Sequence, residues 1–228
     1  MSEHYRHELK YFIGMPEYEL LSRKLALTMN RDSFARKTGG YFIRSLYFDD
    51  YEDRALNEKL EGTDDRDKYR IRIYNFKEDD VKLERKHKAG QYIKKSSLHL
   101  SRAEAGALLN GDYGFLLGRR EEFAHQMYAT FRLRQLKPRV IVDYWREPYT
   151  FPVEDVRVTF DRDIRTAYRA VDLFNRALPT YPAQDGYGMV LEIKFNRFLP
   201  GYIHAILQPV MNAQHSAISK YVLCRKYE

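Results

Sequence analysis

Alternation of apolar and charged residues with a period of two is the feature that most constrains how this chain can fold. Between residues 69 and 74, tyrosine and isoleucine alternate with arginine, so the two kinds of side chain point to opposite faces of a strand. Similar patterns elsewhere bring the number of predicted strands to eight. They cover Tyr5–Phe12, Tyr41–Asp49, Tyr69–Tyr74, Val81–Lys86, Tyr92–Leu98, Arg139–Tyr144, Val156–Asp161 and Met189–Phe195.

Helical periodicity is confined to a few stretches between and after these strands. One helix is predicted after Pro16 (Glu17–Met29), one from Ser101, where Ser101 and Glu104 have capping-box spacing, and one over the last dozen residues from Ser216. No linker, repeat or low-complexity tract interrupts the 228 residues, so we expect a single domain over residues 1–228. The pattern predicts an α+β domain built on a mainly antiparallel sheet.

Composition narrows the partners and the compartment. The formal net charge of +7 indicates an anionic partner, which nucleic acid, acidic lipid and polyphosphate all satisfy. The one cysteine, Cys224, excludes an intramolecular disulfide and a cysteine-based zinc site, and it fits a reducing cytosol. No run approaches the about 18 apolar residues of a spanning helix, and the start lacks the apolar core of a signal peptide. We therefore expect a cytoplasmic protein without a transmembrane segment, which leaves room for a membrane partner on another chain.

The polar faces of the predicted strands carry selected charges rather than ordinary solvated residues. Either each strand exposes its charges to water, or the charged faces converge inside a closed barrel whose apolar faces pack outward against helices. The second arrangement needs an internal counter-charge, because buried charges must be paired. Five strands of the same design favour the closed barrel. Their charged faces hold, strand by strand, Arg70 and Arg72; Lys82, Glu84 and Lys86; Arg157 and Asp161; Glu192 and Lys194; and Arg6, Glu8 and Lys10. Arginine forks and lysines suit phosphate, and carboxylates suit a hard metal ion.

These segments, in this order, resemble a known family, the VTC (vacuolar transporter chaperone) domain. The resemblance runs from Arg6 to Tyr221, each motif being weak alone and the ordered set specific. Its motifs are Ser-Leu-Tyr-Phe-Asp at 45–49, Arg-Ile-Arg at 70–72, Leu-Glu-Arg-Lys at 83–86, Tyr-Trp-Arg at 144–146, Arg-Val-Thr-Phe-Asp at 157–161, Leu-Glu-Ile-Lys at 191–194 and Ser-Lys-Tyr at 219–221. The family belongs to the triphosphate tunnel metalloenzymes, so the resemblance implies an eight-stranded antiparallel β-barrel with flanking helices and a C-terminal helix. It also implies synthesis of polyphosphate from ATP with Mn²⁺ or Mg²⁺.

The resemblance also assigns roles to individual residues. The cations implied to grip phosphate are Lys10, Arg70, Arg72, Lys86, Lys94, Arg146, Arg157 and Lys220, with Lys95 as the alternative to Lys94 if the register of that strand differs by one. Glu192 matches the family's metal-binding carboxylate, and Glu8 and Glu84 are implied to support it. A metal ion and a ring of cations would hold the γ-phosphoryl group in line with the terminal phosphate of a growing chain, without a general base.

Two departures bear on the reaction. The hydrolytic and cyclase branch of the superfamily has Glu-x-Glu-x-Lys on the first strand, whereas this chain has Arg6, Glu8 and Lys10, which favours the VTC branch. Family members often have a further basic residue before Ser219-Lys220-Tyr221, where this chain has Ala217 and Ile218; His215 is one possible substitute.

Four functions stay open at this point. The first is an ATP-dependent polyphosphate polymerase, and the second is a triphosphatase acting on tripolyphosphate or a nucleoside triphosphate. The third is a module that binds polyphosphate or another anion without turnover, for which Glu192 would be unnecessary. The fourth, a general nucleic-acid binder, is disfavoured because the cations alternate with acids along strand faces, so we expect no nucleic acid among the partners.

Overall fold

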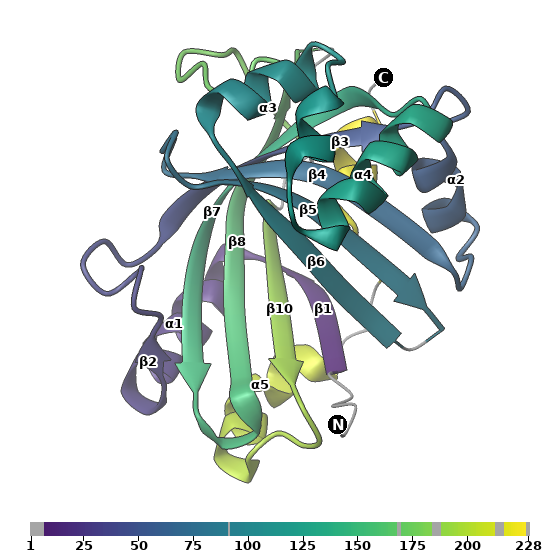
Figure 1. The fold of residues 1–228 in the computed structure, drawn as a ribbon. Helices are drawn as coiled ribbons and strands as arrows, with labels where there is room; N and C mark the ends of the chain where they lie inside the picture. The colour runs from purple at the N-terminus through teal and green to yellow at the C-terminus, as the bar shows by residue number, and fades with distance from the viewer. Residues whose placement is uncertain (1–6, 91, 168–169, 184–187, 213–216, 227–228) are drawn as a thin grey trace. The chain divides into compact units, whose positions relative to one another are not determined.

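A computed structural model describes residues 7–90, 92–167, 170–183, 188–212 and 217–226 (Figure 1). The predicted residues Tyr5, Arg6, His215 and Ser216 lie outside these ranges. The elements in chain order are β1 (His7–Ile13), α1 (Met15–Thr28), β2 (Asn30–Arg31), β3 (Tyr41–Asp49), α2 (Arg54–Leu60), β4 (Arg66–Tyr74), β5 (Val81–Ala89), β6 (Tyr92–Leu100), α3 (Arg102–Leu109), η1 (Gly114–Gly118), α4 (Glu122–Leu133), β7 (Lys137–Phe151), η2 (Val153–Asp155), β8 (Val156–Ala167), β9 (Tyr181–Pro182), β10 (Met189–Phe195), α5 (Gly201–Met211) and α6 (Lys220–Arg225).

The main strands are hydrogen-bonded in the order β1-β10-β8-β7-β3-β4-β5-β6, with β2 on β7 and β9 on β8. The pairs with a resolved register, such as β1 with β10 and β4 with β5, are antiparallel. The predicted α+β class with eight main antiparallel strands is therefore confirmed. No helix among the described residues is long and apolar enough to cross a membrane.

The chain divides into two compact units, and it passes between them several times. Unit 1 comprises Met1–Phe42, Tyr144–Arg165 and Pro182–Ser219, and unit 2 comprises Ile43–Asp143, Thr166–Tyr181 and Lys220–Glu228. Each unit has its own hydrophobic core, and each is described separately below.

In unit 2 the apolar faces of β4, β5 and β6 pack against helices α3 and α4 (Figure 1). Ile71 and Leu83 face each other in the register and are fully buried. Helix α4 covers them with Ala124, Met127 and Phe131, which lie on one face because they are three and four residues apart. Ser101 caps helix α3 with the predicted capping box, in which the Glu104 side chain accepts a hydrogen bond from the Ser101 backbone N–H at 2.8 Å.

In unit 1 the apolar faces of β1, β10 and β8 pack against helices α1 and α5. Leu21 and Leu25 of α1 are buried one turn apart, and α5 contributes Ile203, Leu207 and Val210 at similar spacing. Helix α1 begins after Gly14, whose backbone N–H donates to the Glu17 carboxylate at 3.0 Å. In both units the apolar strand faces meet helices as expected, so the charged faces lie on the opposite side of the strands.

Candidate functional site

The charged face of unit 2 is a set of cross-strand rows on β3, β4, β5 and β6. One row pairs Tyr47, Arg70, Glu84 and Ser97 across the four strands. On the next row, Arg72 donates from Nε to the Ser45 hydroxyl at 3.0 Å. The rows on either side pair a cation of β4 with a cation of β5. The cations on this face include Lys68, Arg70, Arg72, Lys82, Lys86 and Lys95.

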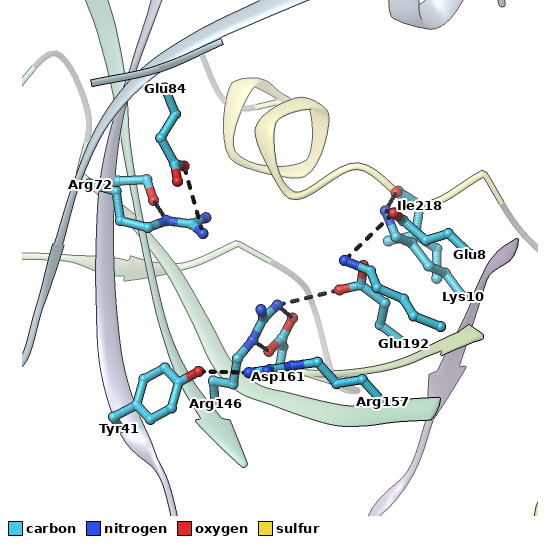
Figure 2. Close-up of polar contacts among 12 residues, drawn as sticks. Glu8, Lys10, Tyr41, Arg72, Glu84, Arg146, Arg157, Asp161, Glu192 and Ile218 are labelled. Atoms are coloured by element: carbon cyan, nitrogen blue, oxygen red, sulfur yellow. Dashed lines mark hydrogen bonds and ion pairs between the residues drawn. The ribbon is translucent and has the colours of Figure 1, made fainter. Parts of the chain in front are cut away.

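Glu84 is the acidic centre of this face and is almost wholly buried. Its Oε2 accepts from Arg70 Nε at 2.7 Å, and its Oε1 forms an ion pair with Lys95. The same Oε2 lies 3.9 Å from Arg72 Nη1 (Figure 2). Burial alone would raise the pKa of the Glu84 carboxyl, but these three cations hold it well below its usual range. Glu84 is therefore a charged carboxylate that gathers three predicted phosphate-binding cations.

The register of β6 corrects one sequence-based assignment. Lys95 lies opposite Lys86, on the face that carries Glu84, whereas Lys94 lies opposite His87. His87 and its cross-strand partner Asp67 share the other face of the sheet with Leu83. The assignment of Lys94 to the charged face is thus wrong, because neighbouring residues of a strand point to opposite faces. Lys95, the alternative named above, is the residue on that face.

Helix α6 lies against the charged face of unit 2. Its Tyr221 stacks on Tyr47, with ring centroids 5.0 Å apart and an interplanar angle of 30°. The Tyr221 hydroxyl donates to Asp49 Oδ2 at 2.6 Å and accepts from Arg225 Nη1 at 2.8 Å. Burial and Asp49 raise the pKa of Tyr221, so the phenol stays protonated. These contacts fix the start of α6, where Lys220 lies, against β3.

The charged face of unit 1 alternates acids and bases across β1, β10 and β8. Lys10 lies opposite Glu192, and Glu8 lies opposite Lys194. Lys194 Nζ joins two carboxylates, at 2.7 Å from Glu192 Oε1 and 3.6 Å from Glu8 Oε2. Lys10 Nζ lies 2.7 Å from Glu8 Oε1 and donates to the Ile218 carbonyl at 3.4 Å (Figure 2). The carboxylates of Glu8 and Glu192 therefore converge on one point, where the Lys194 ammonium group lies.

Arg146 of β7 extends this network through Asp161 of β8. Its guanidinium binds Asp161 with two hydrogen bonds, at 2.7 Å and 2.8 Å, and its Nη2 reaches Glu192 Oε2 at 3.3 Å (Figure 2). Burial would lower the pKa of Arg146, but Asp161, Tyr144 and Glu192 raise it well above the usual value. The backbone here is closely packed, since a side chain at Gly40 would come within 2.5 Å of the Arg146 carbonyl oxygen.

Arg157 of β8 is oriented by two residues that the sequence did not single out. Its Nη1 lies 2.9 Å from Asp32 Oδ2. Its Nη2 donates to the Tyr41 hydroxyl at 3.1 Å (Figure 2). Asp32 follows β2, and its other oxygen accepts from the backbone N–H of Phe34. The loop after β2 thus holds Arg157 on the charged face of unit 1.

Comparison with known protein families decides where this chain belongs. The family model for the VTC domain matches residues 5–227. The chain belongs to the VTC domain family. A search of curated proteins found no matching sequence.

Solved structures support the same fold for this VTC domain. A candidate adenylyl cyclase from Hippeastrum, reported to have a dominant triphosphatase activity, is 14% identical with a TM-score of 0.56; the match covers 97% of this chain and 95% of that chain. A candidate adenylate cyclase from Vibrio parahaemolyticus is 10% identical with a TM-score of 0.53, over 97% and 98% of the two chains. At these identities the likeness concerns the fold alone, which is the triphosphate tunnel fold.

The predicted residues of the VTC domain separate into two groups. Lys10, Arg146, Arg157, Glu8 and Glu192 lie in unit 1, and Arg70, Arg72, Lys86, Lys220 and Glu84 lie in unit 2. Asp161, Lys194 and Tyr47 also belong to the charged faces but were given no role from the sequence. The signal was present for Asp161, because it shares the alternating face of Arg157 and Thr159.

The two charged faces differ in how well their side chains fit the divalent metal ion that the family resemblance implies. Within the described residues, no group of three or more His, Cys, Asp or Glu side chains is arranged to hold a metal ion. The donors in unit 1 nevertheless fit a hard divalent cation, because Glu8 and Glu192 already share one cationic partner. Thr159, opposite Glu192, adds a buried hydroxyl oxygen with no hydrogen-bond partner in the described part of the chain. Glu84 fits less well, because it is enclosed by three cations.

Proposed function

We propose that this VTC domain transfers phosphoryl groups between triphosphate chains in a metal-dependent reaction, and that it synthesises inorganic polyphosphate from ATP. The observation that carries the proposal is the cation cluster around the buried carboxylate of Glu84 in unit 2. Arg70, Arg72 and Lys95 gather around the buried carboxylate of Glu84, so three cations contact one acid. Cations concentrated in this way favour an anionic ligand, and arginine forks match phosphate oxygens.

The cations of unit 2 would bind the phosphate chain and compensate charge on the transferred group. Arg72 is suited to this role because the Ser45 hydroxyl accepts from its Nε and Glu84 Oε2 lies 3.9 Å from its Nη1, so both contacts orient the guanidinium. Arg70 is more tightly engaged, with Nε on Glu84 and Nη1 donating to the Tyr47 hydroxyl at 2.9 Å. Both guanidinium groups are therefore oriented before any ligand binds, which lowers the cost of reorganisation during the reaction.

Unit 1 would hold the divalent cation through Glu192 and Glu8. Mn²⁺ or Mg²⁺ bound there would neutralise charge on the β- and γ-phosphates. Arg146 would then keep Glu192 in place, because Asp161 fixes its guanidinium with two hydrogen bonds. Lys10, Arg157 and Lys194 would add positive charge from the same face.

In this reaction the terminal phosphate oxygen of the acceptor chain attacks the γ-phosphorus of ATP. A new P–O bond forms, the bond to the β-phosphate oxygen breaks, and ADP leaves with the electron pair. The attacking oxygen is already anionic, so the residues of this chain need only bind, align and neutralise charge. This requirement agrees with the sites described above, which supply cations and carboxylates on rigid strands.

A triphosphatase is the second candidate, and the activity reported for the Hippeastrum protein favours it. The same cations would then bind tripolyphosphate or a nucleoside triphosphate, and water would be the acceptor. Arg6 in place of the glutamate of the hydrolytic branch argues for the polymerase, although it lies outside the described residues. A module that only binds polyphosphate would have no need of Glu192 as a metal ligand.

The test is incubation of the purified protein with ATP and Mn²⁺, followed by gel staining for polyphosphate and assays of ADP and free phosphate. The proposal predicts long polyphosphate chains with a matching amount of ADP. Free phosphate without polymer would establish the triphosphatase instead. Tripolyphosphate binding without turnover under any metal would leave the binding module and contradict both enzymes.

A further inference from the structure

Tyr47 is the one tyrosine that the cross-strand register places in the row of Arg70 and Glu84 on the charged face of unit 2. It is buried, yet it does not belong to the apolar core that the opposite face of β3 forms through Leu46 and Phe48. A buried phenol on a charged face is expected to be hydrogen-bonded, and it can both donate and accept.

We propose that the Tyr47 hydroxyl donates a hydrogen bond to a phosphate oxygen of the bound triphosphate, next to Arg70. The inference rests on the proposed function, since it assumes that a phosphate chain occupies this face. It adds a binding residue of a different kind to the cations, namely a neutral donor.

The hydrogen bonding of Tyr47 leaves its proton available. Its oxygen accepts from Arg70 Nη1 at 2.9 Å, so the phenol is used there as an acceptor. Among the residues that the structure describes, its own O–H has no acceptor. A phosphate oxygen bound to Arg70 would lie within reach of this hydrogen and would complete its hydrogen bonding.

The surroundings of Tyr47 favour donation to an anion. Burial would raise the pKa of the phenol, but the nearby cations outweigh burial and lower it below 10.0. These cations are Arg70 and Arg72 of β4 and Lys220 of α6. A more acidic phenol is a stronger hydrogen-bond donor, and it remains uncharged below its pKa.

The ring of Tyr47 is also held in place. Tyr221 of α6 stacks on it, and Asp49 and Arg225 fix the Tyr221 hydroxyl from both sides. A donor that is fixed before binding loses little side-chain entropy when the ligand arrives. Helix α6 therefore has two roles at this face: it carries Lys220, and its Tyr221 fixes the ring of Tyr47.

The test measures binding of inorganic tripolyphosphate by calorimetry at neutral pH, without metal, for the wild type, Tyr47→Phe and Tyr113→Phe. Tyr113 is the matched control, because its hydroxyl donates to the Leu136 carbonyl in the core of the same unit. We expect the Kd to rise about tenfold in Tyr47→Phe, equivalent to about 1.4 kcal/mol, and to change less than about twofold in Tyr113→Phe.

A pH series separates donation from a merely structural role. As the pH rises through the lowered pKa of Tyr47, the wild type should lose tripolyphosphate affinity, because the phenolate cannot donate and repels phosphate. Tyr47→Phe should lack this step, and in the wild type tripolyphosphate should shift tyrosinate formation to higher pH. The wild-type titrations remain informative if the variant does not fold.

The outcomes distinguish the two proposals. If the wild type binds tripolyphosphate and Tyr47→Phe binds it equally well with the same pH profile, the role of Tyr47 is wrong and the proposed function stands. If the wild type does not bind tripolyphosphate, the proposed function is wrong, and the inference falls with it.

Discussion

The two units use the same strand design but differ in the balance of charge on their polar faces. In unit 1 the carboxylates of Glu8, Asp161 and Glu192 alternate with a similar number of cations. In unit 2, Glu84 is the one carboxylate on the middle rows of β4, β5 and β6, and cations surround it. Both faces are backed by an apolar face under two helices, so the difference lies in the charges and not in the packing.

This difference suggests that the two units bind different ligands. A face whose carboxylates nearly match its cations in number offers carboxylate oxygens, which are the ligands that a hard divalent cation prefers. A face with excess positive charge needs an external anion. We therefore assign metal binding to unit 1 and the main phosphate binding to unit 2, and the predictions below test that assignment.

The largest effect is expected for Arg72→Ala. Loss of a fixed donor to the transferred phosphoryl group should lower turnover by about 10²–10³-fold. Arg102→Ala is the control, because Arg102 lies over the Phe174 ring on the apolar side of unit 2 and should retain activity within about twofold. The measurement is ATP turnover with Mn²⁺, with thermal unfolding to verify folding. Normal activity of Arg72→Ala would break the assignment of phosphate binding to unit 2.

Glu84→Gln should destabilise the fold. Removing one partner of a buried ion pair costs about 3–5 kcal/mol, because Arg70, Arg72 and Lys95 would lose their counter-charge. The control Glu19→Gln breaks an exposed pair with Arg23 at 3.9 Å and should cost less than about 1 kcal/mol. Urea unfolding at neutral pH measures both, and tripolyphosphate should restore much of the lost stability. Equal stability of the two variants would contradict the role of Glu84.

The same carboxylate predicts how stability depends on pH. The pKa of Glu84 is lowered in the folded state, so its contribution is present above the ordinary carboxyl pKa of about 4.3 and is lost as the pH falls toward the folded value. The difference in unfolding free energy between the wild type and Glu84→Gln should therefore be full at neutral pH and shrink in acid. A difference that grows below about pH 4 would have the wrong sign.

Lys95→Ala and Lys94→Ala form a matched pair on one strand. Lys95 lies on the Glu84 face, whereas Lys94 lies opposite His87 on the other face. We expect about a fivefold rise in the tripolyphosphate Kd for Lys95→Ala, equivalent to about 1 kcal/mol, and little change for Lys94→Ala. Calorimetry at one salt concentration measures both. The reverse result would show that the register of β6 differs from the one described here.

The smallest effect is expected for Asp32→Asn. The ion pair with Arg157 is partly exposed, so its loss should cost about 0.2–1 kcal/mol and lower turnover by less than about fivefold. Asp163→Asn, which removes an exposed pair with Arg165, is the control and should leave turnover unchanged. A much larger loss in Asp32→Asn would mean that Arg157 contributes more to the reaction than the charge comparison suggests.

Much of the sheet could be predicted because alternation marks both the extent and the face of a strand. Tyr41–Asp49 and Met189–Phe195 match β3 and β10 in full. Helices α2, α4 and α5 were missed. Helix α5 contains Pro209 and begins at Gly201, residues that ordinarily argue against a helix, although its apolar spacing was visible. In α4 the buried residues Ala124, Met127 and Phe131 are three and four residues apart, which is the apolar spacing of a helix and is visible in the sequence.

The candidate site could be predicted only in part, for a physical reason. Within one strand, alternation sets which residues share a face, so the sequence alone groups Arg70 with Arg72. In residues 92–97, Tyr-Ile-Lys-Lys-Ser-Ser, two lysines are adjacent and the sequence does not say which of them shares the face of Glu84. The pairing with β5 places Lys95 there. The Arg146–Asp161 pair and the stacking of Tyr221 on Tyr47 likewise depend on contacts between distant segments.

The most direct test of the division between the units is Mn²⁺ binding to two matched variants. Glu192→Gln and Glu84→Gln remove one buried, ion-paired carboxylate each, from unit 1 and unit 2 respectively. Electron paramagnetic resonance of free Mn²⁺, titrated into each folded variant and the wild type, measures the affinity. We predict that Glu192→Gln loses Mn²⁺ binding and that Glu84→Gln retains it. Loss of binding in Glu84→Gln with retention in Glu192→Gln would contradict the account.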